Sequence, residues 1–403
     1  MFEPMRSLHR KLHFILFIFA VLGLTGCALG RGAPGPAKVF DQAAALIEKN
    51  YIDKSGNPVK LDTSMRPDIS TLIAQTDATT ILLTPEDIET LRNPSGGGIG
   101  VVLGLKNGAY EIIKPLPGSP AQKAGLRRGD KIPEINGAAT GELPINKVVH
   151  LLQGAPGTEV VLKVEEKSGT RKEMTLTRAV IKIQGTAARR LGEKNIVYIR
   201  IEQFLSEAAT EVRTAMKRFG ENDIKGLVVD LRNNGGGLLD SITGVAELFM
   251  KQNEIIATLG GRYDGQEKEL TASKWSPYPG FPIIVLIDGK TSSGAEILAA
   301  ALRDNKHALL VGERSAGICD IQTAYPLKDG SQIRLRTAFA LTTAGARVDG
   351  QGVTPDNVVV LSEEERENIY TRMELFPDLN YTASPADIQL QAAVALLTEN
   401  VKN

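Results

Sequence analysis

The chain has 403 residues, a length typical of two or three domains. Apolar residues make up 42% and charged residues 23%, as in most globular proteins. Lys plus Arg and Asp plus Glu number 47 each, and this balance argues against nucleic acid or an acidic surface as a partner.

The N-terminal segment, 1–26, predicts an export signal. Basic residues precede an apolar run, 14–24, that is too short to span a bilayer. The run leads into Leu-Thr-Gly-Cys, which resembles the cleavage box of bacterial lipoproteins. Cys27 would then be lipidated, and acyl chains would anchor a periplasmic protein. An ordinary secretory signal with a chance cysteine is the alternative. Because residue 28 is not aspartate, resemblance to the enteric sorting rule favours the outer membrane.

Few metal-binding residues would remain after export. The mature chain has two histidines, His150 and His307, and one cysteine besides the lipidated one, Cys319. These are too few for a metal site, and a single free cysteine cannot form an intramolecular disulfide. The sequence therefore predicts no metal or other cofactor.

Residues 27–37 are rich in Gly and Pro and predict a flexible tether. Residues 38–94 have apolar positions at helical spacing and predict a small N-terminal helical region without chemistry of its own.

Residues 95–183 alternate short β-like runs with turn clusters. This stretch resembles a PDZ domain, a mainly β fold with two helices. The resemblance implies that the domain binds a peptide's C-terminal tail as an added strand. His150 lies in the helix that would line the groove, where a packed or solvated role is the simpler interpretation. The loop that would bind the terminal carboxylate matches Gly98, Ile99, Gly100 and Val101.

Residues 184–361 predict an α/β unit. Short apolar, β-branched runs alternate with helical stretches, which indicates crossover connections and a largely parallel sheet. Residues 362–403 form a C-terminal helical region. The expected strands are 195–204, 226–232, 281–288 and 307–313, and the expected helices between them are 205–220, 238–252 and 294–305.

Two strand-to-helix turns carry the chemistry. The first, 230–241, contains three consecutive glycines before a helix, a setting that can bind an anion. It lacks the Lys and Ser/Thr of a phosphate loop, which argues against nucleotide binding. The second places Ser292 and Ser293 before an Ala-rich helix, near the positive end of the helix dipole. Taken alone, this turn favours a plain serine cap over a catalytic serine.

The order of these segments resembles the carboxyl-terminal processing (tail-specific) serine proteases. The decisive stretches are LVVDLRNNGGGLLDS, TSSGAEILAAALRD, VGERSAGICDIQTAYPL and VDGQGVTPD, which follow the PDZ-like unit. The resemblance runs from about Val39 almost to the C-terminus. It implies an α/β core of the crotonase/ClpP-like type, an inserted PDZ domain and helical ends. It also implies an exported endopeptidase whose PDZ domain presents unstructured C-terminal tails to a Ser–Lys dyad, which cleaves through an acyl-enzyme.

Residue by residue, the resemblance assigns the nucleophile to Ser293. Ser292 falls where the family usually has alanine, so it is the weaker match. The other matched positions are Asp304 at the end of the helix, Gly236 and Gly294 as oxyanion donors, and Gln322 near the dyad lysine.

The family's general base is a lysine 25 residues after the serine, and this position holds Ile318. Gly317 and Gln322 match on either side and fix the register. Isoleucine has no proton-accepting atom. Three interpretations stay open: an inactive pseudoprotease that keeps PDZ binding as a scaffold, adaptor or decoy; a substitute base; or slow hydrolysis without one. The substitutes considered are Asp320, His307, Lys290 and Lys328, whereas Cys319 would point away from Asp320 in a strand.

The expected partners are proteins with unstructured C-termini. The membrane is expected to be a partner only through the lipid anchor. A homo-oligomer through the helical ends or an adaptor lipoprotein is a further option.

Overall fold

The computed structural model describes residues 35–400, apart from 65, 78, 86, 89–96, 107, 117, 142, 144, 182–184, 193–194, 222, 262–267, 279 and 376–385. The predicted signal segment and Cys27 lie outside the described residues. Within these limits, no helix has both the length and the apolar character that crossing a membrane requires.

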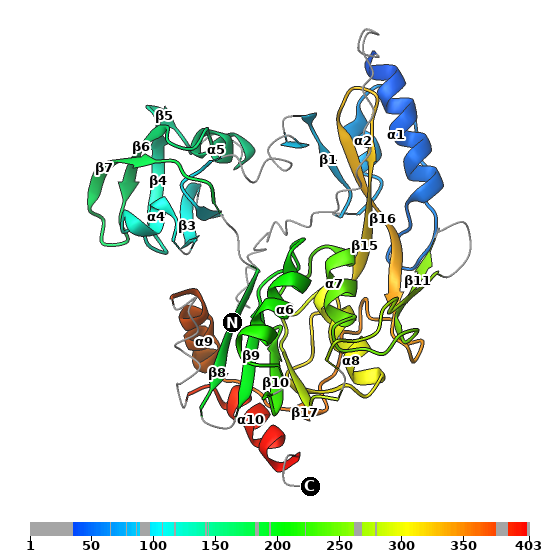
Figure 1. Cartoon of the computed structure of the whole chain (residues 1–403). Coiled ribbons are helices and arrows are strands. Elements are labelled where there is room, and N and C mark those ends of the chain that lie inside the picture. Colours follow the sequence, from blue (N-terminus) through cyan, green and yellow to red (C-terminus); the bar gives the residue numbers. More distant parts are fainter. Residues whose placement is uncertain are drawn as a thin grey trace, which may run out of the picture.

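A six-stranded sheet forms the centre of the core, in the order β17-β14-β13-β10-β9-β8 (Figure 1). All neighbouring pairs are parallel except β8 with β9. The four apolar runs predicted as strands are β9, β10, β13 and β14, so the predicted parallel sheet is confirmed. The strands are β8 (Thr186–Leu191), β9 (Ile196–Ile201), β10 (Gly226–Asp230), β13 (Ile283–Ile287), β14 (Ala308–Gly312) and β17 (Asn357–Val358).

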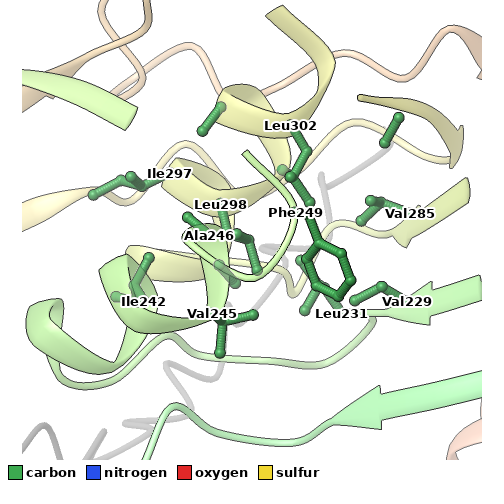
Figure 2. Close-up of a cluster of buried hydrophobic side chains, with 14 of the residues drawn as sticks. Val229, Leu231, Ile242, Val245, Ala246, Phe249, Val285, Ile297, Leu298 and Leu302 are labelled. Carbon is green, nitrogen blue, oxygen red and sulfur yellow. The ribbon is translucent and has the colours of Figure 1, made fainter. Parts of the chain in front are cut away.

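Helices cover both faces of this sheet, which is why its strands are apolar on both sides. In β10, Leu227 and Val229 belong to the apolar cluster under α6, α7 and α8, whereas Val228 belongs to the cluster under α9 and α10. Figure 2 shows side chains of β10 and β13 packed against those of α7 and α8. The helices are α6 (Ala208–Arg218), α7 (Leu239–Ala246), α8 (Gly294–Asp304), α9 (Glu363–Leu375) and α10 (Ile388–Asn400).

A second, antiparallel sheet was not expected from the sequence. Its longest strand, β16, pairs with β1, β11 and β15, and β11 also pairs with β12. The N-terminal region is therefore not purely helical, because β1 joins this sheet and α1 packs on β16. A three-residue strand whose partner lies about 250 residues later has no local sequence signal. The elements are α1 (Pro36–Asn50), α2 (Ile69–Ile73), β1 (Ile81–Leu83), β11 (Ile255–Gly261), β12 (Lys268–Thr271), β15 (Asp320–Pro326) and β16 (Gln332–Leu341).

The PDZ-like unit has its own sheet, in the order β2-β3-β4-β6-β7 with β5 beside β4, and its own apolar core. Figure 1 shows this unit set to one side of the α/β core. An ion pair of 2.7 Å between Lys114 Nζ and Glu202 Oε2 links the two. The elements are β2 (Val101–Lys106), β3 (Ala109–Pro115), α4 (Pro120–Lys123), β4 (Lys131–Ile135), β5 (Ala138–Ala139), α5 (Ile145–Leu152), β6 (Glu159–Glu165) and β7 (Arg171–Thr177).

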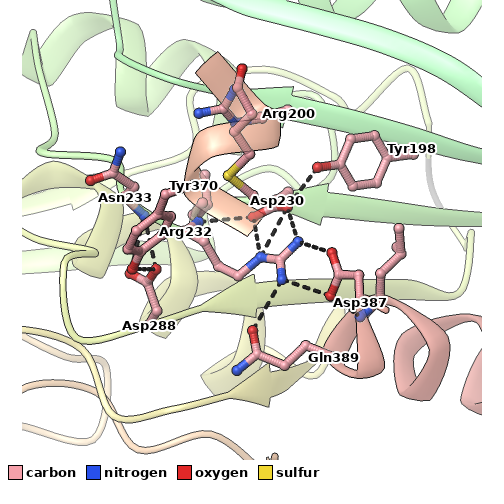
Figure 3. Close-up of polar contacts among 12 residues, drawn as sticks. Tyr198, Arg200, Asp230, Arg232, Asn233, Asp288, Tyr370, Asp387 and Gln389 are labelled. Atoms are coloured by element: carbon pink, nitrogen blue, oxygen red, sulfur yellow. Dashed lines mark hydrogen bonds and ion pairs between the residues drawn. The ribbon is translucent and has the colours of Figure 1, made fainter. Parts of the chain in front are cut away.

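A buried ion-pair network ties the C-terminal helices to the end of β10 (Figure 3). Arg232, only 1% exposed, lies between two carboxylates. Its Nη2 is 2.6 Å from Asp230 Oδ2 and 2.8 Å from Asp387 Oδ2, and its Nη1 contacts Gln389 Oε1 at 3.1 Å. Tyr198 donates to Asp230 Oδ2 at 2.6 Å. Each buried charge is thus paired and hydrogen-bonded, as its burial demands.

We expect Asp387→Ala to lower the free energy of unfolding by about 3–5 kcal/mol, because it leaves the buried Arg232 with one counter-ion fewer. Urea unfolding measures this loss. The control is Glu363→Ala, which removes an exposed ion pair of α9 and should cost under about 1 kcal/mol.

Burial raises the pKa of Asp387, but Arg232 and backbone N–H donors lower it further, so the net pKa lies below the ordinary value. The stabilisation by the ionised carboxylate is then complete above the unfolded-state pKa of about 4 and is lost as the pH falls through the lower folded pKa. The difference in the free energy of unfolding between wild type and Asp387→Ala should therefore become smaller as the pH falls below about 4. A difference that stays constant below this pH would contradict a stabilising ion pair between Arg232 and Asp387.

Candidate active site

Ser293 lies at the turn between β13 and α8, with φ 58° and ψ −127°. A positive φ is uncommon for a residue with a side chain, so the surrounding structure has to hold it. The Ser293 N–H donates to the Ile318 carbonyl at 2.7 Å and to Glu296 Oε2 at 3.0 Å. A strained strand-to-helix turn of this kind presents the nucleophilic serine of α/β-hydrolases. The conformation favours Ser293 as the nucleophile over Ser292, which is buried.

Glu296 fixes the nucleophile turn to the segment that follows β14. Its side chain is fully buried, and burial raises its pKa while four hydrogen bonds oppose that shift. The pattern Ser-x-x-Glu is the sequence signal, although by itself it indicates only a helix cap. The donors, at 2.5 to 3.1 Å, are the N–H groups of Ser293, Gly317 and Ile318 and the hydroxyl of Ser315.

Gly236 lies against Ser293. A Cβ at this position would be 2.8 Å from both the Ser293 Cβ and the Gly294 nitrogen, and its φ is 91°, so only glycine fits. The predicted use of its N–H as an oxyanion donor is wrong for this conformation, because that N–H donates to Asn234 Oδ1 at 2.7 Å. The N–H groups of Gly237 and Gly294 make no hydrogen bond within the described part of the chain. These two are therefore the candidate donors to an oxyanion.

Ile318 lies directly beside Ser293, because its carbonyl accepts the Ser293 N–H. It is 59% exposed and offers no group that could take a proton. The next residue, Cys319, is fully buried, with its Sγ 3.5 Å from the Ser293 carbonyl oxygen. Burial raises the pKa of this thiol far above its ordinary value, so Cys319 stays protonated and is not a base.

Two candidate substitute bases, Lys290 close to Ser293 and Asp320 close to Ile318 in the sequence, contact other side chains. The ammonium group of Lys290 lies 4.1 Å from the centroid of the Tyr370 ring, a cation–π contact. The carboxylate of Asp320 is 2.8 Å from Nη2 of the buried Arg336. Burial raises the pKa of Asp320, and Arg336 works against that shift. Both groups are engaged in contacts that do not involve Ser293.

Three other predicted residues lie away from Ser293. Asp304 is the last residue of α8, the helix end at which the sequence placed it, and it lies about 16 Å from Ser293 at 1.5 Å per residue. Its catalytic role stays a prediction. It accepts a hydrogen bond from Thr343 Oγ1 at 3.0 Å and anchors the helix end. His307 follows that same end and is 2.5 Å from Glu254 Oε2. Lys328 is exposed in the turn between β15 and β16, on the order of 20 Å along the strand from Asp320.

Gln322 lies in β15, where it pairs with Arg336 of β16. Its contribution to the site stays a prediction.

The predicted carboxylate loop of the PDZ-like unit precedes β2, which is an edge strand of its sheet. Gly98 forms a bridge with Ala179, and Ile99 is buried. Gly100 has φ 72°, and a Cβ there would be 2.4 Å from the Ser119 Cβ. The N–H groups of Ile99 and Gly100 are without a hydrogen bond among the residues described. Val101 begins β2, and His150 is exposed on α5.

Comparison with known proteins identifies the family. The model of peptidase family S41 matches residues 195–359, and that of a PDZ domain matches residues 111–166. A carboxyl-terminal-processing protease of Synechocystis sp. is 33% identical over 390 residues, which cover 90% of this chain and 87% of the relative. The chain belongs to peptidase family S41. The predicted protease family and the α/β fold with a PDZ domain and helices at both ends are confirmed.

Other S41 relatives agree with this assignment. The carboxy-terminal processing protease CtpA of Bacillus subtilis is 29% identical and covers 86% of this chain and 76% of its own length. Among solved structures, a photosystem II D1 C-terminal processing protease matches with a TM-score of 0.57 and 26% identity, over 81% of this chain and 94% of that one. A putative S41 protease from Bacteroides fragilis shares the fold, with a TM-score of 0.58 at 18% identity over 89% and 97% of the two chains.

We expect Gly236→Ala to destabilise the S41 core, because the new Cβ would meet Ser293 and the Gly294 backbone at 2.8 Å. The cost should be about 2–4 kcal/mol, from left-handed backbone strain plus steric overlap. The matched control is Gly345→Ala, which has φ 76° but no atom within 4 Å of the new Cβ and so carries the strain alone. Urea unfolding compares the two variants, and equal losses would contradict the close approach of the glycine loop to Ser293.

Proposed function

We propose that this S41 chain is an exported endopeptidase that captures unstructured C-terminal tails with its PDZ domain and cleaves them through a Ser293 acyl-enzyme. The observation that carries this proposal is the strained Ser293 turn, packed against a glycine loop whose Gly237 N–H, like that of Gly294, has no hydrogen-bond partner among the described residues. Keeping a residue in such a conformation costs free energy, which is typical of functional sites. Export and lipidation at Cys27 belong to the same proposal and rest on the N-terminal sequence.

The PDZ domain supplies the tail-binding step. The outer edge of β2, which pairs with no strand among the residues described, can accept a peptide as an added antiparallel strand, with backbone hydrogen bonds that do not depend on sequence. The N–H groups of Ile99 and Gly100, which have no hydrogen bond in the described part of the chain, can then bind the terminal carboxylate. This arrangement selects chain ends over internal segments.

Ser293 supplies the covalent step. Its Oγ attacks the peptide carbonyl carbon, the C–N bond breaks, the amine leaves with a proton, and water later hydrolyses the ester. The two free N–H groups and the N-terminus of α8 stabilise the negative charge on the carbonyl oxygen. Without a lysine, the Ser293 proton passes to solvent, which costs about 10²–10⁴ in rate. The proposed peptidase is accordingly slow.

A second candidate function is tail binding without hydrolysis, as a periplasmic scaffold or adaptor. The observation that favours it is the apolar Ile318 beside Ser293, together with the separate engagement of Lys290, Asp320 and His307.

The substitution Ile318→Lys should raise kcat by about 10²–10⁴, because it supplies an amine beside Ser293 that can act as base when a bound tail excludes water. The assay follows cleavage of an unfolded protein with a free C-terminus. Ile318→Met, which has a similar length and no amine, should stay at the wild-type rate. Ser293→Ala should abolish cleavage in either background.

The outcomes separate the two functions. Slow wild-type cleavage that disappears with Ser293→Ala supports the endopeptidase. Cleavage only after Ile318→Lys supports the non-hydrolytic tail-binding protein. If neither the wild type nor Ile318→Lys cleaves the substrate, the assignment of Ser293 as a nucleophile is refuted.

A peptide with a free C-terminus should bind the full chain about 10- to 100-fold more tightly than the same peptide with a C-terminal amide, because the amide loses charge-assisted hydrogen bonds. Fluorescence anisotropy with the Ser293→Ala variant measures both affinities without turnover. Equal affinities would rule out carboxylate capture by the loop at Ile99 and Gly100.

A further inference from the structure

We propose that Tyr370, in α9, is a positioning residue for the active site. Its hydroxyl holds the carboxylate of Asp288, and that carboxylate joins the nucleophile turn to the glycine loop. The inference rests on the proposed role of Ser293, and it gives the C-terminal region an indirect part in catalysis, through Asp288.

Asp288 follows β13 and is almost completely buried. Its Oδ1 accepts the N–H groups of Lys290 and Thr291 at 2.9 Å each, and these residues lead into Ser293. The same carboxylate accepts the N–H of Asn233 at 3.1 Å, in the turn after β10. One side chain therefore fixes the starts of both catalytic turns.

Tyr370 completes the set of donors to this carboxylate. Its hydroxyl donates to Asp288 Oδ2 at 2.6 Å, and Figure 3 shows the two side chains in contact beside Asn233. Burial raises the pKa of Tyr370 well beyond its ordinary value, with Asp288 acting in the same direction, so the phenol stays a neutral donor. The Lys290 ammonium also lies over the Tyr370 ring, so α9 contacts the nucleophile turn at a second point.

The turns that Asp288 joins are also bonded to each other next to the reacting groups. Ser292 donates its N–H to the Asn234 carbonyl at 2.9 Å, and Thr291 Oγ1 donates to the Leu231 carbonyl at 2.8 Å. A rotation of the Asp288 carboxylate would thus shift Asn233 and Asn234 relative to Ser293. The distance between nucleophile and oxyanion donors would change, and rates are sensitive to displacements of about 1 Å.

Other contacts keep α9 in place if the Tyr370 hydroxyl is removed. Arg366 pairs with Glu313 at 2.9 Å, and the Met373 carbonyl accepts from Arg200 at 3.3 Å. Tyr370→Phe therefore tests the hydroxyl contact without detaching the helix.

The experiment compares Tyr370→Phe with Tyr278→Phe in the full chain, each with and without Ile318→Lys. Tyr278, away from the catalytic turns, is also buried, and burial together with the carboxylate of Glu221 raises its pKa. Tyr370→Phe should lower kcat about tenfold at unchanged KM, the effect of one charged hydrogen bond. The backbone amides of Asn233, Lys290 and Thr291 should exchange about tenfold faster with deuterium. Tyr278→Phe should change neither quantity.

Unchanged amide exchange in Tyr370→Phe, or an equal change in Tyr278→Phe, would overturn the positioning role whether or not the chain cleaves. A rise in KM at constant kcat would overturn it as well, since that pattern indicates substrate binding. Faster exchange confined to Tyr370→Phe, in a chain that never cleaves, would support the contact while refuting the proposed peptidase function.

Discussion

The parallel pairing of β10 with β13 is the constraint on which the candidate site depends. Neighbouring parallel strands bring their carboxyl ends to the same edge of the sheet, so the glycine loop after Asp230 and the Ser293 turn after Ile287 must meet there. Hydrogen bonds from Ser292 to Asn234 and from Asn233 to Asp288 then hold the two turns together. The strained backbone of Ser293 can persist because these bonds come from both strands.

Burying charged side chains beneath this edge of the sheet costs free energy, and residues of the C-terminal helices offset that cost by pairing with them. Arg232 and Asp288 are buried at the ends of two strands, where an unpaired charge would be strongly destabilising. Asp387 and Gln389, at the start of α10, satisfy Arg232, and Tyr370 of α9 satisfies Asp288. The helical C-terminus is thereby part of the same unit as the site, in both stability and geometry.

The site itself combines an intact nucleophile turn with an apolar neighbour at residue 318. Glu296 is bonded to the backbone at Gly317 and Ile318, so the segment keeps its position without any contribution from a lysine side chain. The strained Ser293 and the glycine at 236 are compatible with peptide cleavage, whereas the isoleucine at 318 lowers the expected rate of cleavage. The proposed capture of peptides at the PDZ edge strand does not depend on residue 318, so it is part of both proposed functions.

The sequence by itself determined the family, the parallel strands and the PDZ-like unit, because apolar runs and turn glycines are local signals, and it predicted Ser293 as the nucleophile. It also placed isoleucine at position 318. The tertiary structure alone decided that the Gly236 N–H is taken by Asn234 and that β1 joins β16. It also revealed Asp288, Glu296 and Tyr370 as the groups that hold the site. Their partners lie on segments up to 82 residues away, and hydrogen bonds between such segments leave no periodic pattern in the chain.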